Sequence, residues 1–164
     1  MMNKRFAVTG VAAVLTIALA AGVGLAPSGA ATPGEIVKKR QETMKQLGGN
    51  MKAIKTFLET GEGSAADVAA RAAEINDIAG KIPSLFPEGT GMDEVKDPEN
   101  GAKPEIWLEW DKFTAAAKGL GDRSAALKTA AVEGSNPAIA AAFEEMGTNG
   151  CGSCHKPYRV KLEK

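Results

Sequence analysis

Apolar residues recur at alternating intervals of three and four along much of this chain, and this spacing constrains its fold more than any other feature. In the segment from Thr32 to about Leu58, five apolar residues follow it: Met44, Leu47, Met51, Ile54 and Leu58. Residues spaced in this way lie on one face of an α-helix. Thr32-Pro33, a cap residue followed by a first-turn proline, and Gly61-Glu62-Gly63 provide start and stop signals.

Three further segments show the same period. Residues 64–82 open at Ser64 and stop before Pro83, residues 104–120 run from Pro104 to just before Gly121, and the last segment starts at Asn136-Pro137. Residues 124–133 are interpreted as a short helix of their own, and residues 84–103, rich in Gly, Asp and Pro, as a loop. Four amphipathic helices predict an all-α, antiparallel four-helix bundle.

The charge balance excludes some functions. The 164 residues carry 20 Lys and Arg against 20 Asp and Glu, so there is no basic field to hold nucleic acid. A hydrophobic content of 44% argues against an intrinsically disordered chain. The composition therefore indicates a folded domain that does not bind nucleic acid.

Residues 1–31 have the pattern of a secretory signal peptide. Lys4 and Arg5 precede an apolar run from Phe6 to Leu25, and small residues follow it, ending in Ala30 and Ala31. The alternative is an uncleaved membrane anchor, because the run is long enough to span a bilayer. Cleavage leaves residues 32–164 with no membrane span, 18 basic and 20 acidic side chains, and a periplasmic location.

The strongest chemical signal is the sequence Cys151-Gly152-Ser153-Cys154-His155. It contains both cysteines and the single histidine of the chain. C-x-x-C-H is the attachment pattern of a c-type haem. On a helix these three side chains share one face, so both thiols can form thioethers while the imidazole binds the iron. The motif predicts one covalently bound haem c near the C-terminal helix.

Three other interpretations of the motif are weaker. A zinc site needs four ligands, and Cys and His together supply only three here. A C-x-x-C redox pair belongs to a thioredoxin-like βαβ fold, of which the sequence shows no strand pattern. A structural disulfide across two intervening helical residues is geometrically awkward.

The chain resembles the class II cytochromes c, the cytochrome c prime family, over nearly all of its mature length. The most specific signal is the motif followed by Tyr158-Arg159. The other resembling pieces are individually weak: Arg40 with Met44 four residues later, Leu85-Phe86-Pro87, and Pro104-Glu105-Ile106-Trp107. The resemblance implies a four-helix bundle whose last helix carries the haem, and it opens the possibility of a homodimer paired through the first two helices.

In this family the distal residue of the first helix separates five-coordinate from six-coordinate haem, and here that residue is Met44. Met146 lies on the haem-bearing helix itself, and Met51 lies about 10 Å along the first helix from Met44. Met44 is therefore the best candidate for a second axial iron ligand beside His155. The alternative is a methionine that only fills the core.

Met/His ligation suits outer-sphere electron transfer, so the sequence predicts a periplasmic carrier of single electrons that serves redox partner proteins. The alternative is a five-coordinate cytochrome c prime that binds nitric oxide or carbon monoxide. An enzyme is not expected, because no second histidine is present for acid–base catalysis.

Four further residues receive supporting roles. Arg40 extends the inward stripe of the first segment, where a buried cation needs an anionic partner, and the family resemblance suggests a haem propionate; the alternative is a surface arginine. Arg159, one helical turn after His155, is expected beside the propionates or the haem edge. Trp107 and Tyr158 are candidates to pack on the macrocycle, or are ordinary core.

Overall fold

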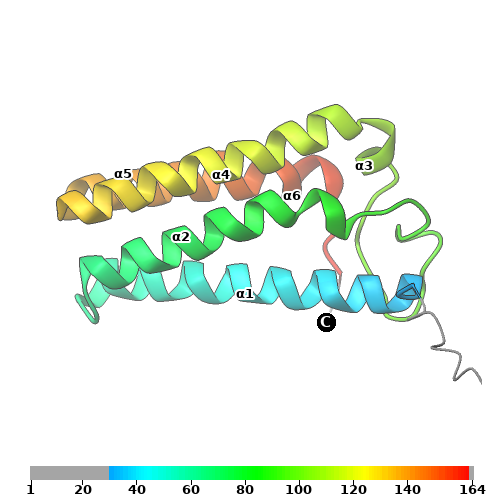
Figure 1. The fold of residues 1–164 in the computed structure, drawn as a ribbon, viewed down its shortest axis with the longest axis horizontal. Helices are drawn as coiled ribbons and strands as arrows, with labels where there is room; N and C mark the ends of the chain where they lie inside the picture. Colours follow the sequence, from blue (N-terminus) through cyan, green and yellow to red (C-terminus); the bar gives the residue numbers. More distant parts are fainter. Residues whose placement is uncertain (1–29, 163–164) are drawn as a thin grey trace, which may run out of the picture. The chain divides into compact units, whose positions relative to one another are not determined.

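The computed structural model describes residues 30–162, which form a helical bundle. Figure 1 shows that successive long segments run antiparallel, and within residues 30–162 the one β-type pairing is an isolated bridge between Ala102 and Arg159. The predicted all-α four-helix bundle is therefore confirmed. The long segments are α1 (Pro33–Thr60), α2 (Ala65–Lys81), α4 (Trp110–Glu133) and the run α5 (Asn136–Glu145), η2 (Met146–Cys151) and α6 (Gly152–Tyr158). The apolar run of the predicted signal peptide lies outside the described residues.

Two helices start where the sequence places their caps. The Thr32 hydroxyl accepts a hydrogen bond from the Glu35 N–H at 3.3 Å, and the Glu35 carboxylate accepts one from the Thr32 N–H at 2.7 Å. Ser64 and Asp67 make the same reciprocal pair at the start of α2, at 3.1 and 2.9 Å. Each capping box satisfies backbone donors that the first helical turn leaves unpaired. At its other end, α1 stops at Gly61, which has φ of 74°.

The densest packing lies between α2 and α4. Small buried residues from both helices, among them Ala72, Ala79 and Ala117, allow the two backbones to approach closely. The Asn76 side chain on α2 donates to the Gly121 carbonyl on α4 at 2.7 Å. These two helices form a rigid pair against which α1 and the C-terminal run are placed.

The predicted boundaries of the third helix were wrong. Residues 104–120 and 124–133 are not separate helices; α4 continues through Gly121 to Glu133, because Gly121 packs against α2, and this contact outweighs the low helix propensity of glycine. The first residues of the segment predicted to start at Pro104 form a separate short helix, α3 (Glu105–Leu108). A break at Glu109 separates α3 from α4. Trp110, the first residue of α4, is 37% exposed.

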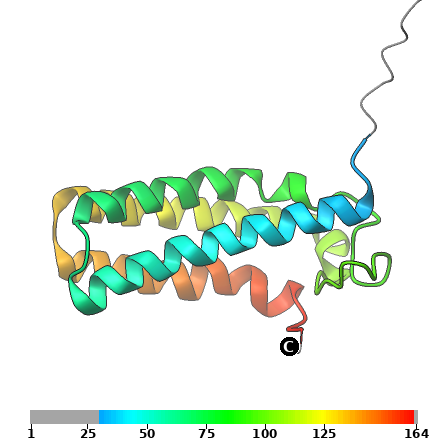
Figure 2. The same cartoon turned by 90° about the horizontal axis from the view of Figure 1, so that it is seen from below.

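The connection between α2 and α3 is a loop, as predicted, apart from one 3-10 turn, η1 (Pro83–Leu85). It covers the end of the bundle at which α1 begins (Figures 1 and 2). Trp107 fixes it by donating from Nε1 to the Phe86 carbonyl at 3.0 Å. Within residues 30–162, no helix combines the length and the apolar character needed to cross a membrane.

Candidate functional site

The three motif side chains lie at the junction of η2 and α6. Cys151 is the last residue of η2, and Cys154 and His155 lie in the first turns of α6. All three are half-buried, and both thiols are free and pack against the hydrophobic core. The structure therefore brings the predicted attachment residues together on one short helical stretch.

Burial sets the protonation of these groups. It raises the pKa of the Cys151 thiol and of the Cys154 thiol, so both are neutral at pH 7. Burial, and then the positive charge of Arg159, lowers the pKa of the His155 imidazole. A neutral imidazole has a free nitrogen lone pair, which is the form that binds a metal ion.

Helix α1 leaves an apolar strip only partly covered. Its stripe residues Val37 and Ile54 are buried, at 0 and 1% exposure, whereas Met44, Leu47 and Met51 are half-buried. These three nevertheless pack against the same core cluster as the two cysteines. Apolar surface that the protein's own atoms do not cover, beside two thiols and an imidazole, fits a large flat apolar group attached at the motif.

The level of Met44 relative to the motif follows from one contact. The Met51 methyl carbon Cε lies 3.8 Å from the position that a Cβ on Gly147 would occupy. Helix α1 and the α5–α6 run are antiparallel (Figure 2). Seven residues back from Met51 is Met44 and seven residues on from Gly147 is Cys154, each about 10 Å along its helix. Met44 therefore lies at the level of Cys154 and His155.

Arg40 is buried, with 5% exposure, and it holds the loop that follows η1. Its Nε donates to the Leu85 carbonyl at 3.0 Å, and its Nη1 and Nη2 donate to the Thr90 carbonyl at 3.1 Å and the Thr90 hydroxyl at 2.6 Å. Its guanidinium carbon lies 4.0 Å from the centre of the Phe86 ring. Burial lowers its pKa to about 10. The partners that hold Arg40 are neutral, and the predicted propionate contact stays a prediction.

The other supporting residues have protein partners. Arg159 is exposed and follows the last residue of α6 in extended conformation. The sequence placed Arg159 one helical turn after His155, but the helix ends before it. Tyr158 is 5% exposed, packs edge-on against Phe113 with ring centres 5.5 Å apart, and places its hydroxyl 3.3 Å from the Glu109 carboxylate. The ring of Trp107 lies over Gly91. Tyr158 therefore belongs to the core and Trp107 packs against it, and the contact of either ring with a macrocycle stays a prediction.

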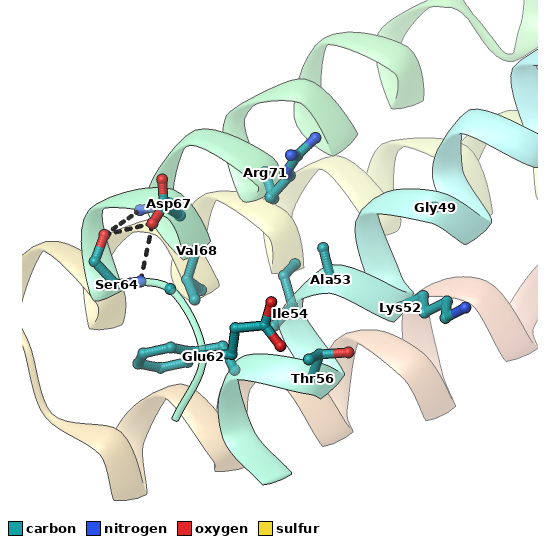
Figure 3. A pocket seen from close by; sticks show the side chains of 12 residues that line it. Gly49, Lys52, Ala53, Ile54, Thr56, Glu62, Ser64, Asp67, Val68 and Arg71 are labelled. Atoms are coloured by element: carbon teal, nitrogen blue, oxygen red, sulfur yellow. Dashed lines mark hydrogen bonds between the residues drawn. The ribbon is translucent and has the colours of Figure 1, made fainter. Parts of the chain in front are cut away.

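A pocket of about 440 Å³ lies elsewhere, between the second half of α1 and the start of α2 (Figure 3). Charged side chains surround it, including Lys52, Glu62 and Arg71, over an apolar floor that includes Ile54. It contains neither thiol nor imidazole, and none of the predicted site residues lines it. It is not the attachment site.

Sequence reasoning missed two parts of the site. The partners of Arg40 lie 45 and 50 residues away in a loop and are mostly backbone carbonyls, which no residue pattern identifies. The π-helical turn η2, which ends at Cys151, was also missed, although two glycines within it, Gly147 and Gly150, are a local sign of irregular helix.

Comparisons with known proteins identify the family of the chain. A family model described as "Cytochrome C′" matches residues 35–159. Cytochrome c-556 of Agrobacterium fabrum is 35% identical over 149 residues, covering 89% of this chain and 95% of the relative. Cytochrome c′ of Rhodospirillum rubrum is 31% identical over 148 residues, covering 90% and 97%. The crystal structure of cytochrome c′ from Thermochromatium tepidum is similar, with a TM-score of 0.71 and 32% identity over 80% of this chain and 98% of that one.

Proposed function

Because the chain belongs to the cytochrome c′ family, we propose that it binds a small neutral gas, nitric oxide or carbon monoxide, on the iron face opposite His155. The chain is a c-type cytochrome with one covalent haem c. The haem, when bound, supplies an iron centre that changes oxidation state and coordinates small molecules. Cys151 and Cys154 would attach it, and His155 would supply one axial nitrogen.

The observation that carries the proposal is the character of α1 at the level of His155. Met44 lies at that level and Leu47 follows about one turn further along α1; both are half-buried, and neither has a nitrogen ligand. His155 is the single histidine of the chain, so no second imidazole can occupy the opposite face. An apolar surface with at most a thioether suits a neutral diatomic ligand and excludes charged ones.

The comparisons support gas binding over the electron-carrier interpretation that the sequence favoured. The family and the Rhodospirillum rubrum relative are described as cytochrome c′. A structurally similar protein is a carbon monoxide-bound variant of cytochrome c prime from Alcaligenes xylosoxidans, with a TM-score of 0.68 and 25% identity. We transfer ligand binding to this chain as a proposal on that basis.

Electron transfer is the second candidate, and Met44 favours it. A thioether at the level of His155 can complete six-coordinate iron, which takes up electrons with little rearrangement. In that case the partners are redox proteins of the periplasm. Neither candidate requires acid–base catalysis, in keeping with a protein that is not an enzyme.

The optical spectrum of the purified haem protein, with and without carbon monoxide, tests the proposal. Gas binding predicts a high-spin spectrum in the reduced protein and a rapid change on adding carbon monoxide. A low-spin reduced spectrum that carbon monoxide leaves unchanged would instead assign electron transfer and reject gas binding.

A homodimer is also part of the proposal. A similar cytochrome c′ structure, with a TM-score of 0.73 and 32% identity, is described as showing an unusual ligand-controlled dimer dissociation. Sedimentation of the reduced protein with and without carbon monoxide tests whether this chain pairs and whether the gas separates the pair.

A further inference from the structure

The C-terminal run of the bundle contains one residue too many for a regular α-helix to turn all of its buried side chains toward the core. From α5 onward, Ile139 and Met146 are both fully buried, with 0% exposure. They are seven residues apart, and at about 100° per residue they point to within about 20° of each other. The direction of the core is therefore fixed up to Met146.

Beyond Met146, a regular α-helix would no longer turn the buried side chains toward the core. The direction is kept only if one residue is taken up in a wider turn. Tyr158 is the next large side chain of the run to be buried, at 5% exposure, and it packs on Phe113 of α4. In an uninterrupted α-helix, Tyr158 would point about 120° away from Met146. With one residue fewer the difference falls to about 20°. The observed burial of both side chains thus requires that one residue be taken up between them.

The π-helical turn η2 takes up that residue. It spans Met146–Cys151, and the Gly152 N–H that closes it donates to the Gly147 carbonyl five residues earlier, in place of the usual four. Gly150 lies against α4, where an added Cβ would stand 3.0 Å from the Leu120 Cδ1 atom. The wide turn is therefore pressed directly against the rigid α2–α4 pair.

Side chains hold the turn on both sides. The Asn149 amide donates to one oxygen of Glu145 at 2.7 Å, and Arg123 of α4 donates to the other oxygen at 2.9 Å. After the turn, the Ser153 hydroxyl donates to the Gly150 carbonyl at 2.7 Å. The rotation that the turn introduces is thus fixed relative to α4.

The rotation decides where the attachment residues point. In a regular helix His155 would lie about 180° from the buried Met146, and Cys151 about 140°. With one residue absorbed, these angles fall to about 80° and 40°, and Cys154 comes within about 20° of Met146. This agrees with the half-burial of all three side chains.

We propose that the π-helical turn Met146–Cys151 is the positioning element of the attachment site, turning Cys151, Cys154 and His155 from the solvent side of the helix to the haem-binding side. The inference rests on the covalent attachment of haem. It does not depend on whether the iron binds a gas or carries electrons.

Two length variants at the exposed Thr148 test it, with Thr148→Ala as the matched control. Deleting Thr148 should convert the turn into regular α-helix with unchanged phase, so the haem content and the spectrum of wild type persist. Inserting one alanine after Thr148 should rotate the motif by about a further 100°, with loss of His155 ligation and of the slow hydrogen exchange of residues 152–158.

Haem content per chain, electron paramagnetic resonance of the ferric iron, and hydrogen exchange followed by mass spectrometry give the readouts. The inference is overturned if the deletion fails to fold or loses His155 ligation while Thr148→Ala does not. It is equally overturned if the insertion keeps wild-type ligation and exchange. An insertion variant that fails to fold, next to a deletion variant that behaves as wild type, supports it.

Discussion

Arg40 places a positive charge in the protein interior, and all of its hydrogen-bond partners there are neutral groups. Its three hydrogen bonds join α1 to the loop between Leu85 and Thr90, and the Phe86 ring lies under its guanidinium group. A lysine cannot reproduce this fork of donors. Arg40 therefore fixes the loop that closes the end of the bundle.

Replacing Arg40 by Met should lower the free energy of unfolding by about 2–4 kcal/mol, because the Thr90 hydroxyl and two carbonyls lose their donor. Urea unfolding of the haem protein measures the change. The control is Gln41→Ala, which removes an exposed hydrogen bond to the Glu99 carbonyl and should change stability by less than about 0.5 kcal/mol. Equal effects of the two substitutions would show that Arg40 does not hold the loop.

Met44 separates the two candidate functions. Met44→Leu keeps volume and apolarity nearly constant, so it should cost less than about 1.5 kcal/mol of stability. Gas binding predicts that the spectrum stays high-spin and that carbon monoxide binds at a similar rate. Stopped-flow mixing measures that rate. The control is Met51→Leu, about two helical turns further along α1. A change from low-spin to high-spin iron in Met44→Leu alone would identify Met44 as a ligand.

At the scale of the helices, the cap residues and the spacing of apolar residues carried most of the information. They predicted the start of α1 at Thr32 and of α2 at Ser64, and the stop before Pro83. The length of α4 could not be read in the same way, because the glycine at 121 signals a stop in sequence and a close contact in space. The π-helical turn was equally hidden, since periodicity assumes a constant angle per residue.

Glycines in the helices should respond to alanine according to their surroundings. No heavy atom lies within 4 Å of a Cβ built on Gly48, so Gly48→Ala should raise stability by about 1 kcal/mol through helix propensity. A Cβ on Gly150 would meet Leu120 at 3.0 Å, so Gly150→Ala should lower stability. Thermal unfolding of the two variants gives the comparison, and stabilisation by Gly150→Ala would contradict the close contact with α4.

The first turn of α1 should depend on pH. Hydrogen bonds from the backbone and hydroxyl of Thr32 lower the pKa of Glu35. A carboxyl group whose pKa is lowered by folding stabilises the fold above its unfolded pKa, and this stabilisation is lost as the pH falls through the folded pKa. Glu35→Gln should therefore be less stable than wild type at pH 7, and the gap should close as the pH falls through the folded pKa of Glu35. A gap that is constant with pH in urea unfolding would exclude a role for the ionised carboxylate.

At the scale of the whole molecule, the sequence was enough for the bundle and for the attachment motif, because both depend on local spacing. What joins the parts was not predictable. The hydrogen bonds of Arg40, Trp107 and Asn76 to backbone carbonyls span 21 to 50 residues. A carbonyl is present at every residue, so sequence alone does not select which one is used.

Removing the haem should weaken the whole bundle. Without it, the half-buried strip of Met44, Leu47 and Met51 and the two thiols stay open to water. The double variant with Cys151→Ala and Cys154→Ala should release its haem into acid acetone, whereas the unchanged protein retains it. Circular dichroism melting should show a lower midpoint for the haem-free chain. An equal midpoint would mean that the strip is not a haem-contacting surface.

The pairing of the chain's last described segment with the loop after α2 has a mechanical consequence. The Val160 N–H donates to the Gly101 carbonyl at 2.9 Å, and the Lys103 N–H donates to the Tyr158 carbonyl at 3.1 Å. A pull on the C-terminal end is therefore carried first by these two bonds and passes into the loop. The helix that bears Cys154 and His155 is shielded from that tension until the pairing breaks.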